Sequence, residues 1–122
     1  YAPTFLELAG APIPADIQGV SLVPLLKGQH PKNWRKSVYY HFYEFPAEHS
    51  VRRHYGVRGE RYKLIHFYND NDAWELYDLK NDPTEMHNLY GDPKKGVTKE
   101  MKKELLRLQK QYDDSIRFQQ KL

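Results

Sequence analysis

Cysteine is absent from this 122-residue chain. Disulfide bridges, zinc–thiolate sites and cysteine nucleophiles are therefore excluded, and the redox compartment cannot be read from cysteine usage. The chain also lacks an apolar run long enough to cross a bilayer, and it shows no signal peptide. We expect no membrane-spanning segment, although a leader removed before Tyr1 stays open because the first residue is not Met.

Neither sign of charge dominates the composition. Lys and Arg number 19 and Asp and Glu number 16, which gives a net charge of +3. This small excess favours anionic partners such as sulfated sugars, but it is too dispersed to indicate nucleic-acid binding. Hydrophobic residues make up only 39% of the chain, yet ten tyrosines and two tryptophans supply surfaces that can be half buried. The composition fits a single domain with one sheet covered on one side.

A strand pattern followed by an acidic turn occupies residues 74–89. Between Trp74 and Leu79, apolar and polar side chains alternate with the period of two that is typical of a half-buried strand. Asn81-Asp82-Pro83 then ends the strand, since proline offers no backbone donor and Asn and Asp side chains bond their own backbone in turns. These residues by themselves indicate a strand and a tight turn without chemistry.

Three earlier segments also have strand patterns: Val38–Glu44, His54–Arg58 and Tyr62–Tyr68. In the first of them, Val38, Tyr40 and Phe42 would share one face. Because the connecting loops are short, the four strands predict an antiparallel sheet over residues 37–79.

A long helix is predicted over residues 98 to about 118, with Thr98 as its cap and Glu100 in its first turn. Its apolar side chains recur at spacings of four and three, which forms one stripe that should lie across the sheet. The stripe consists of Met101, Leu105, Leu108, Tyr112 and Ile116. The fold class is therefore α+β, with a four-stranded antiparallel sheet packed against a long C-terminal helix.

The first 35 residues form a mostly irregular and helical N-terminal arm. Pro3 and Gly10 bracket a short helix, and Ser21 leads a leucine-rich helical turn that ends at Leu26. The arm carries more apolar surface than a segment of this length buries alone. We expect it to be disordered or to dock onto a neighbouring chain, so an oligomer formed through the arm is possible.

The order of these pieces resembles the end of the formylglycine-dependent sulfatases. In that family, a strand reading E-L-Y-D-L, then D-P with an acidic residue, then N-L, closes the small C-terminal subdomain; residues 75–89 follow this pattern. Residues 2–26 also follow the family, with A-P-T, L-x-L-A-G, P-x-P, Q-G and S-L-x-P-L-L in order. The resemblance covers nearly the whole chain and is nearest to sulfatases of N-acetylglucosamine 6-sulfate and glycosaminoglycans.

The resemblance implies that residues 1–35 end the catalytic-domain region and that residues 36–122 form the C-terminal subdomain. Sulfatases use a formylglycine made within a C/S-x-P-x-R motif and a calcium ion held by their N-terminal domain, and the chain contains no such motif. No catalytic residue and no metal ligand is therefore assigned here. Asp70 and Asp72 resemble half a calcium loop, but they lack the glycine and the distant glutamate, so a polar turn is favoured.

The segment 48–58 concentrates histidine and arginine. Arginine pairs with sulfate through its planar fork, and histidine can donate to sugar hydroxyls or sulfate oxygens. Since similar segments in the resembled sulfatases lie near the substrate pocket, we expect His54, with Arg53 and His49, to help recognise a sulfated sugar. Arg58 and Arg61 are expected to pair with acidic neighbours in the sheet.

His41 and His66 lie on different strands and could approach each other. Without a clear carboxylate partner at ligand spacing, we favour ordinary histidines over a metal pair.

The resemblance favours the C-terminal part of a sulfatase that hydrolyses sulfate esters of glycans and is secreted or periplasmic in a bacterium. Its partners would be the N-terminal catalytic domain and a sulfated glycan, and the 122 residues alone should be inactive. A free-standing glycan-binding or protein-interaction module is the alternative, and a reading frame that begins near Tyr1 would favour it. A nucleic-acid-binding module is weaker, because the aromatic residues alternate as in core strands rather than forming an exposed platform.

Overall fold

The computed structural model describes residues 1–68, 72–92 and 96–114. The chain divides into two compact units, Tyr1–Arg35 and Lys36–Leu122. No helix among the described residues is long and apolar enough to span a membrane.

The first unit is built on two short helices that pack against each other, α1 (Ala2–Leu8) and α2 (Val23–Leu26). Gly10 has a φ of +66°, a left-handed conformation that glycine adopts freely and that ends α1. The buried hydroxyl of Thr4 accepts a hydrogen bond from the Leu22 amide at 3.0 Å, which ties the two helices together. Both predicted helical segments of the arm are therefore present.

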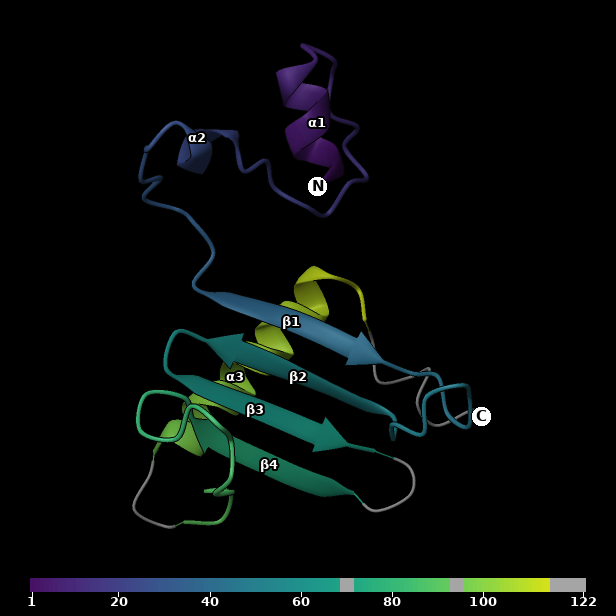
Figure 1. The fold of residues 1–122 in the computed structure, drawn as a ribbon, viewed down its shortest axis with the longest axis vertical. Helices are drawn as coiled ribbons and strands as arrows, with labels where there is room; N and C mark the ends of the chain where they lie inside the picture. Colours follow the sequence, from purple (N-terminus) through teal and green to yellow (C-terminus); the bar gives the residue numbers. More distant parts are fainter. Residues whose placement is uncertain (69–71, 93–95, 115–122) are drawn as a thin grey trace. The chain divides into compact units, whose positions relative to one another are not determined.

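The second unit is a four-stranded antiparallel sheet in the order β1-β2-β3-β4, with helix α3 across one face (Figure 1). Its elements are β1 (Ser37–Phe42), β2 (His54–Gly59), β3 (Tyr62–Phe67), β4 (Ala73–Asp78) and α3 (Val97–Gln111). The α+β prediction and the four predicted strands are confirmed, with boundaries shifted by up to two residues.

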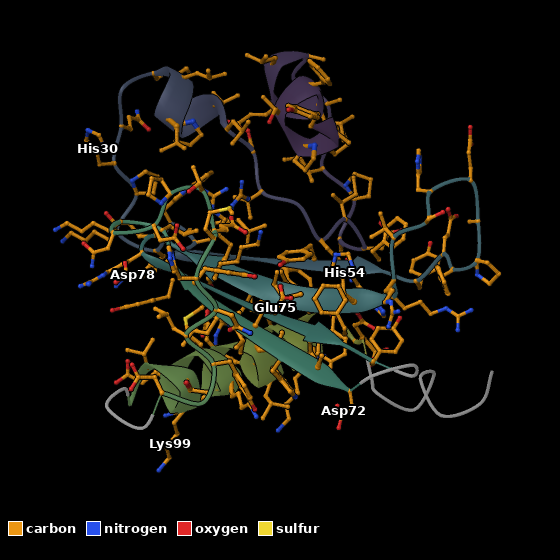
Figure 2. All side chains as sticks on the ribbon, turned by 60° about the horizontal axis from the view of Figure 1, so that its bottom comes forward. His30, His54, Asp72, Glu75, Asp78 and Lys99 are labelled. Carbon is orange, nitrogen blue, oxygen red and sulfur yellow. The ribbon has the colours of Figure 1, made fainter. Side chains whose placement is uncertain are left out.

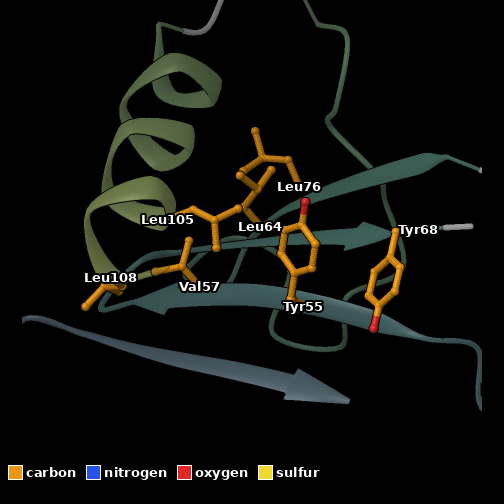
Figure 3. Close-up of a cluster of buried hydrophobic side chains, with 7 residues drawn as sticks. All are labelled: Tyr55, Val57, Leu64, Tyr68, Leu76, Leu105 and Leu108. Carbon is orange, nitrogen blue, oxygen red and sulfur yellow. The ribbon is translucent and has the colours of Figure 1, made fainter. Parts of the chain in front are cut away.

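The two faces of the sheet have different surroundings. The face toward α3 carries the core, and Val57, Leu64 and Leu76 on it are completely buried (Figure 3). Leu105 and Leu108 of α3 close this core, because residues three apart lie on the same side of a helix. The opposite face carries the alternate residues of each strand, among them Tyr40, Gly56 and Glu75.

The ends of α3 differ from the predicted ones. The helix begins after Gly96, whose carbonyl accepts a hydrogen bond from the Glu100 amide at 3.2 Å, so Thr98 lies inside the first turn and does not cap it. The helix ends at Gln111, well before residue 118, and Asp113 has a φ of +52°, which a continuing helix does not allow. Met101, Leu105, Leu108 and Tyr112 face the core as predicted, whereas Ile116 lies outside the described residues.

The acidic turn motif that follows β4, residues 82–89, has structural roles. The Asp82 carboxylate accepts a hydrogen bond from the His87 amide at 2.8 Å, which closes the turn. Asn88 then covers the outer edge of β4, because its side chain accepts from the Leu76 amide and donates to the Trp74 carbonyl. An exposed strand edge otherwise leaves backbone groups unpaired, so this asparagine protects the edge of the sheet.

Asp78, at the end of β4, is buried and binds Arg61 through a two-pronged ion pair with distances of 3.1 and 2.8 Å. The backbone amide of Lys80 and the side chain of Asn81 also donate to this carboxylate. The Arg61 bonds are the largest cause that lowers the pKa of Asp78 from 3.8 to about 2. The prediction that Arg61 pairs with an acidic residue of the sheet is confirmed.

Acid should weaken the fold through Asp78. The pKa of its carboxyl is lower in the folded chain, so the unfolded chain takes up the proton first as the pH falls. The contribution of Asp78 to the free energy of unfolding is therefore complete above pH 3.8 and is lost as the pH falls toward about 2. In urea unfolding at a series of pH values, Asp78→Asn should be less stable at neutral pH and should lose less stability within this window. Glu60→Gln, which removes an exposed carboxylate from the β2–β3 turn, is the control. Equal acid sensitivity of Asp78→Asn and the unchanged protein would contradict the prediction.

Candidate functional site

The candidate site lies on the face of the sheet away from α3, where β1 ends and β2 begins. Figure 2 shows His54 and Glu75 on this side. The strand register pairs His54 with Phe42 of β1 and with Phe67 of β3, so the three rings form a row across the sheet.

The imidazole of His54 is held between two phenyl rings. It stacks on Phe42 with 5.6 Å between ring centroids and lies 5.3 Å from Phe67, while Tyr40 meets it edge-on at 5.9 Å. Aromatic contacts at such separations favour a defined orientation of the ring. Since the side chain is only partly buried, the ring is both restrained and accessible.

The hydrogen bonds of His54 define its tautomer. Nδ1 lies 2.8 Å from the carbonyl oxygen of Arg52. A carbonyl oxygen can only accept, so Nδ1 must carry a hydrogen. In the neutral ring Nε2 then presents a lone pair, and it has no hydrogen-bond partner among the described residues. The arrangement offers an acceptor for one O–H or N–H group of a ligand.

Arg53 binds the loop that joins β1 to β2. Its Nε donates to the Tyr43 carbonyl at 3.0 Å and its Nη2 donates to the Phe45 carbonyl at 2.6 Å. Its own carbonyl accepts a bond from the Tyr68 amide at 3.3 Å, just beyond β3. Two of the five guanidinium N–H groups are thus committed within the protein.

His49 lies in the same loop and is exposed. It takes part in no hydrogen bond, ion pair or ring contact with the described part of the chain. Of the three residues assigned to sugar recognition from the sequence, the fold therefore orders His54 and Arg53 by specific contacts, whereas His49 is held only by its place in the loop.

His41 and His66 share the α3 face but do not form a pair, because Tyr55 lies between them in the strand register. His41 bonds Asp114 and the Tyr68 hydroxyl, and His66 bonds the Tyr55 hydroxyl and Asp72. Residues 1–68, 72–92 and 96–114 contain no group of three His, Asp or Glu side chains able to hold a metal ion. Asp70 of the half calcium loop lies outside the described residues.

Tyr40 lies beside His54 and covers Gly56 of the neighbouring strand. Its hydroxyl is buried and has no hydrogen-bond partner in the described structure. Burial, more than the nearby carboxylates of Glu85 and Glu75, raises the pKa of this hydroxyl. Arg58, on the same face, is exposed, and the predicted ion pair for it is not found among the described residues.

The sequence pattern does not identify Phe42, Phe67 or Tyr40 as site residues. It places Phe42 and Tyr40 only on one face of a strand. What the sequence does not give is the pairing of the strands. Once His54 is aligned with Phe42 and Phe67, the alternation of side chains along each strand puts all three on one face of the sheet.

Comparison with known proteins assigns residues 1–111 to the family model described as "N-sulphoglucosamine sulphohydrolase, C-terminal". An N-acetylglucosamine-6-O-sulfatase of Bacteroides thetaiotaomicron is 55% identical over 121 residues, which cover 94% of this chain and 21% of that protein.

Two solved structures share the fold at considerable identity. BT4656, in complex with its substrate D-glucosamine-2-N,6-O-disulfate, matches with a TM-score of 0.90 and 55% identity over 93% of this chain and 24% of that one. BT1596, a 2-O glycosaminoglycan sulfatase, matches with a TM-score of 0.80 and 35% identity over 94% of this chain and 25% of that one. The chain therefore spans about a fifth to a quarter of the length of these relatives.

Proposed function

This chain belongs to the family of sulfatase C-terminal domains, and on that premise we propose that it works as the C-terminal part of an enzyme that removes sulfate from a sulfated glucosamine. The observation that carries the proposal is the 55% identity over 94% of the chain to an N-acetylglucosamine-6-O-sulfatase. A solved structure at the same identity, BT4656, holds its substrate D-glucosamine-2-N,6-O-disulfate.

Within such an enzyme, residues 1–35 are the end of the catalytic-domain region and residues 36–122 are the C-terminal subdomain. The described residues present no metal-binding group, and the sequence contains no C/S-x-P-x-R motif, so they do not fit calcium or formylglycine. Both groups belong to the catalytic domain, where formylglycine supplies the nucleophile and calcium neutralises the sulfate. The subdomain contributes substrate recognition and structural support.

His54 is the direct contact to the sugar in this proposal. Its neutral ring presents an acceptor at Nε2, and a sulfate ester has only acceptor oxygens to offer. Nε2 of the neutral ring is therefore matched to a hydroxyl group of the sugar rather than to its sulfate. Arg53 and His49, in the adjoining loop, complete the recognition segment.

The other binding partners follow from the proposed sulfatase function. The catalytic domain is the macromolecular partner, and the exposed apolar side chains of the arm, such as Phe5, Leu8 and Leu26, provide surface for it or for a second copy. Nucleic acid is not a partner, since the net charge is only +3. A sulfatase of this kind acts outside the cytoplasm, in the periplasm or after secretion.

Turnover by the complete polypeptide tests the proposed function. It should release sulfate from N-acetylglucosamine 6-sulfate, whereas the 122-residue chain should release none, because it lacks a nucleophile motif. Sulfate release is measured by ion chromatography, with the 2-sulfate of a hexuronate as the comparison substrate. Turnover by the 122-residue chain, or preference of the complete polypeptide for the hexuronate sulfate, would contradict the proposal.

A further inference from the structure

The loop that joins β1 to β2 depends on side chains for its hydrogen bonds. Residues 43–51 form no backbone–backbone hydrogen bond with the described part of the chain. Side chains instead bind carbonyls of this loop: Arg53 donates to those of Tyr43 and Phe45, and His54 donates to that of Arg52. A loop without its own backbone bonds has many accessible conformations, so these contacts decide which one it adopts.

From this geometry we infer that Arg53 is a positioning residue: its guanidinium fork holds the β1–β2 loop and thereby fixes the orientation of His54. The link runs through Arg52, because the carbonyl that defines the tautomer of His54 belongs to this residue, which lies in the loop that Arg53 clamps. The inference rests on the proposed function, since the orientation of His54 matters for activity only if His54 contacts the sugar.

A support on the α3 side of the sheet holds Arg53 itself. The carbonyl of Arg53 accepts from the Tyr68 amide, and the Tyr68 hydroxyl lies 2.6 Å from Nε2 of His41. Nδ1 of His41 lies 2.7 Å from the Asp114 carboxylate, which also accepts a bond from the Tyr39 hydroxyl.

The hydrogens in this support can be assigned. A carboxylate only accepts, so Nδ1 of His41 carries the hydrogen and Nε2 of the neutral ring accepts from Tyr68. Every hydrogen-bonding group in the series has a partner of the opposite kind. A fully satisfied, partly buried series of hydrogen bonds restrains the groups in it, so the end of β3 supports Arg53.

The two bonds to carbonyls require the shape of arginine. A guanidinium donates from two nitrogens in one plane, whereas the ammonium group of lysine is a compact charge that cannot reach both carbonyls in the same way. Arg53→Lys therefore keeps the positive charge and removes the fork. If Arg53 acted mainly as a charge beside the sulfate, lysine would retain much of the effect.

The test measures the ring of His54 and the kinetics of the complete polypeptide. With histidines labelled with ¹⁵N, His54 in the unchanged protein should give the signals of the Nδ1–H tautomer, identified by their loss in His54→Ala. In Arg53→Lys, this tautomer should be partly lost, KM for N-acetylglucosamine 6-sulfate should rise about tenfold, and kcat should change less than about twofold. Arg58→Lys changes an exposed arginine of β2 and is the control. It should alter neither the His54 signals nor the kinetics. The thermal midpoint is recorded for each variant.

The outcomes separate the inference from the proposed function. An unchanged His54 signal in Arg53→Lys overturns the positioning role, whatever KM does. A fall in kcat with unchanged KM and a lowered thermal midpoint also overturns it, because that result shows only a loss of folded protein. If the His54 signal changes as expected but His54→Ala leaves the kinetics unchanged, the proposed contact between His54 and the sugar is wrong.

Discussion

Replacement of His54 by alanine in the complete polypeptide is expected to lower kcat/KM for N-acetylglucosamine 6-sulfate by about 10- to 100-fold. The reason is the lone pair at Nε2, which has no partner among the described residues and is matched to a sugar hydroxyl. Without the imidazole, that hydroxyl would enter the site without its acceptor, and an unpaired polar group costs about 1–3 kcal/mol.

A small aryl sulfate separates recognition of the sugar from the chemistry of sulfate transfer. It carries the ester but no sugar hydroxyl, so His54→Ala should hydrolyse it at an unchanged rate. An equal loss on both substrates would contradict the assignment, since it would indicate a general defect of the enzyme.

Two further substitutions serve as comparisons for His54. His87→Ala removes a histidine of the same unit whose side chain is 81% exposed, and it should not change the kinetics. His49→Ala tests the neighbouring prediction from the sequence. Because His49 has no ordering contact with the described residues, we expect it to have a smaller effect than His54.

Gly56→Ala is expected to lower the free energy of unfolding by about 3 kcal/mol, a large fraction of the stability of a domain of this size. An added Cβ at Gly56 would lie 2.6 Å from the Leu64 carbonyl oxygen of β3, and it would also collide with the ring of Tyr40. A side chain could swing away, but the carbonyl belongs to the strand backbone. Relief of the contact would therefore separate two paired strands of the sheet.

Gly59→Ala is the matched control, because Gly59 ends the same strand. Its added Cβ would meet only the Tyr62 carbonyl oxygen at 3.6 Å, an ordinary contact. In thermal unfolding of the 122-residue chain, the midpoint should fall by roughly 10 °C for Gly56→Ala and hardly at all for Gly59→Ala. Similar midpoints for the two variants would show that the strands tolerate the additional atom.

Tyr40 also helps to explain why a glycine can stand in a central strand. Glycine leaves a gap in the covered surface of a sheet, and an aromatic ring from a neighbouring strand can fill it. In the double variant Gly56→Ala with Tyr40→Ala, the collision with the ring is removed together with the ring's own packing, so the relevant comparison is with the summed stability losses of the two single variants. The loss in the double variant should be smaller than that sum, while the contact with the backbone of β3 remains.

Much of the fold follows from local patterns. Alternation placed the four strands, and the spacing of Met101, Leu105, Leu108 and Tyr112 gave the face of α3 that packs on the sheet. The ends of the helix were wrong by one and by about seven residues, because the backbone of Gly96 and the left-handed conformation of Asp113 outweighed the apolar pattern. Ends of elements depend on single residues, whereas the elements themselves depend on many.

The candidate site was less accessible to sequence reasoning. The residue types of the site could be predicted, since histidine and arginine are concentrated within residues 48–58. The contacts of these residues could not be predicted. The bonds from Arg53 to two carbonyls, and the rings on either side of His54, join residues that only the strand pairing brings together.

The sequence by itself determined the family, the four strands, the apolar stripe of the helix and the residue types available for recognition. These follow from short-range periodicity and from the order of motifs along the chain. Only the tertiary structure decided that Asn88 covers the edge of β4, that Arg53 clamps a loop, and that His54 presents a hydrogen-bond acceptor. The physical reason is that a hydrogen bond has a direction and a distance, and for groups on different strands both are fixed by the register of the sheet.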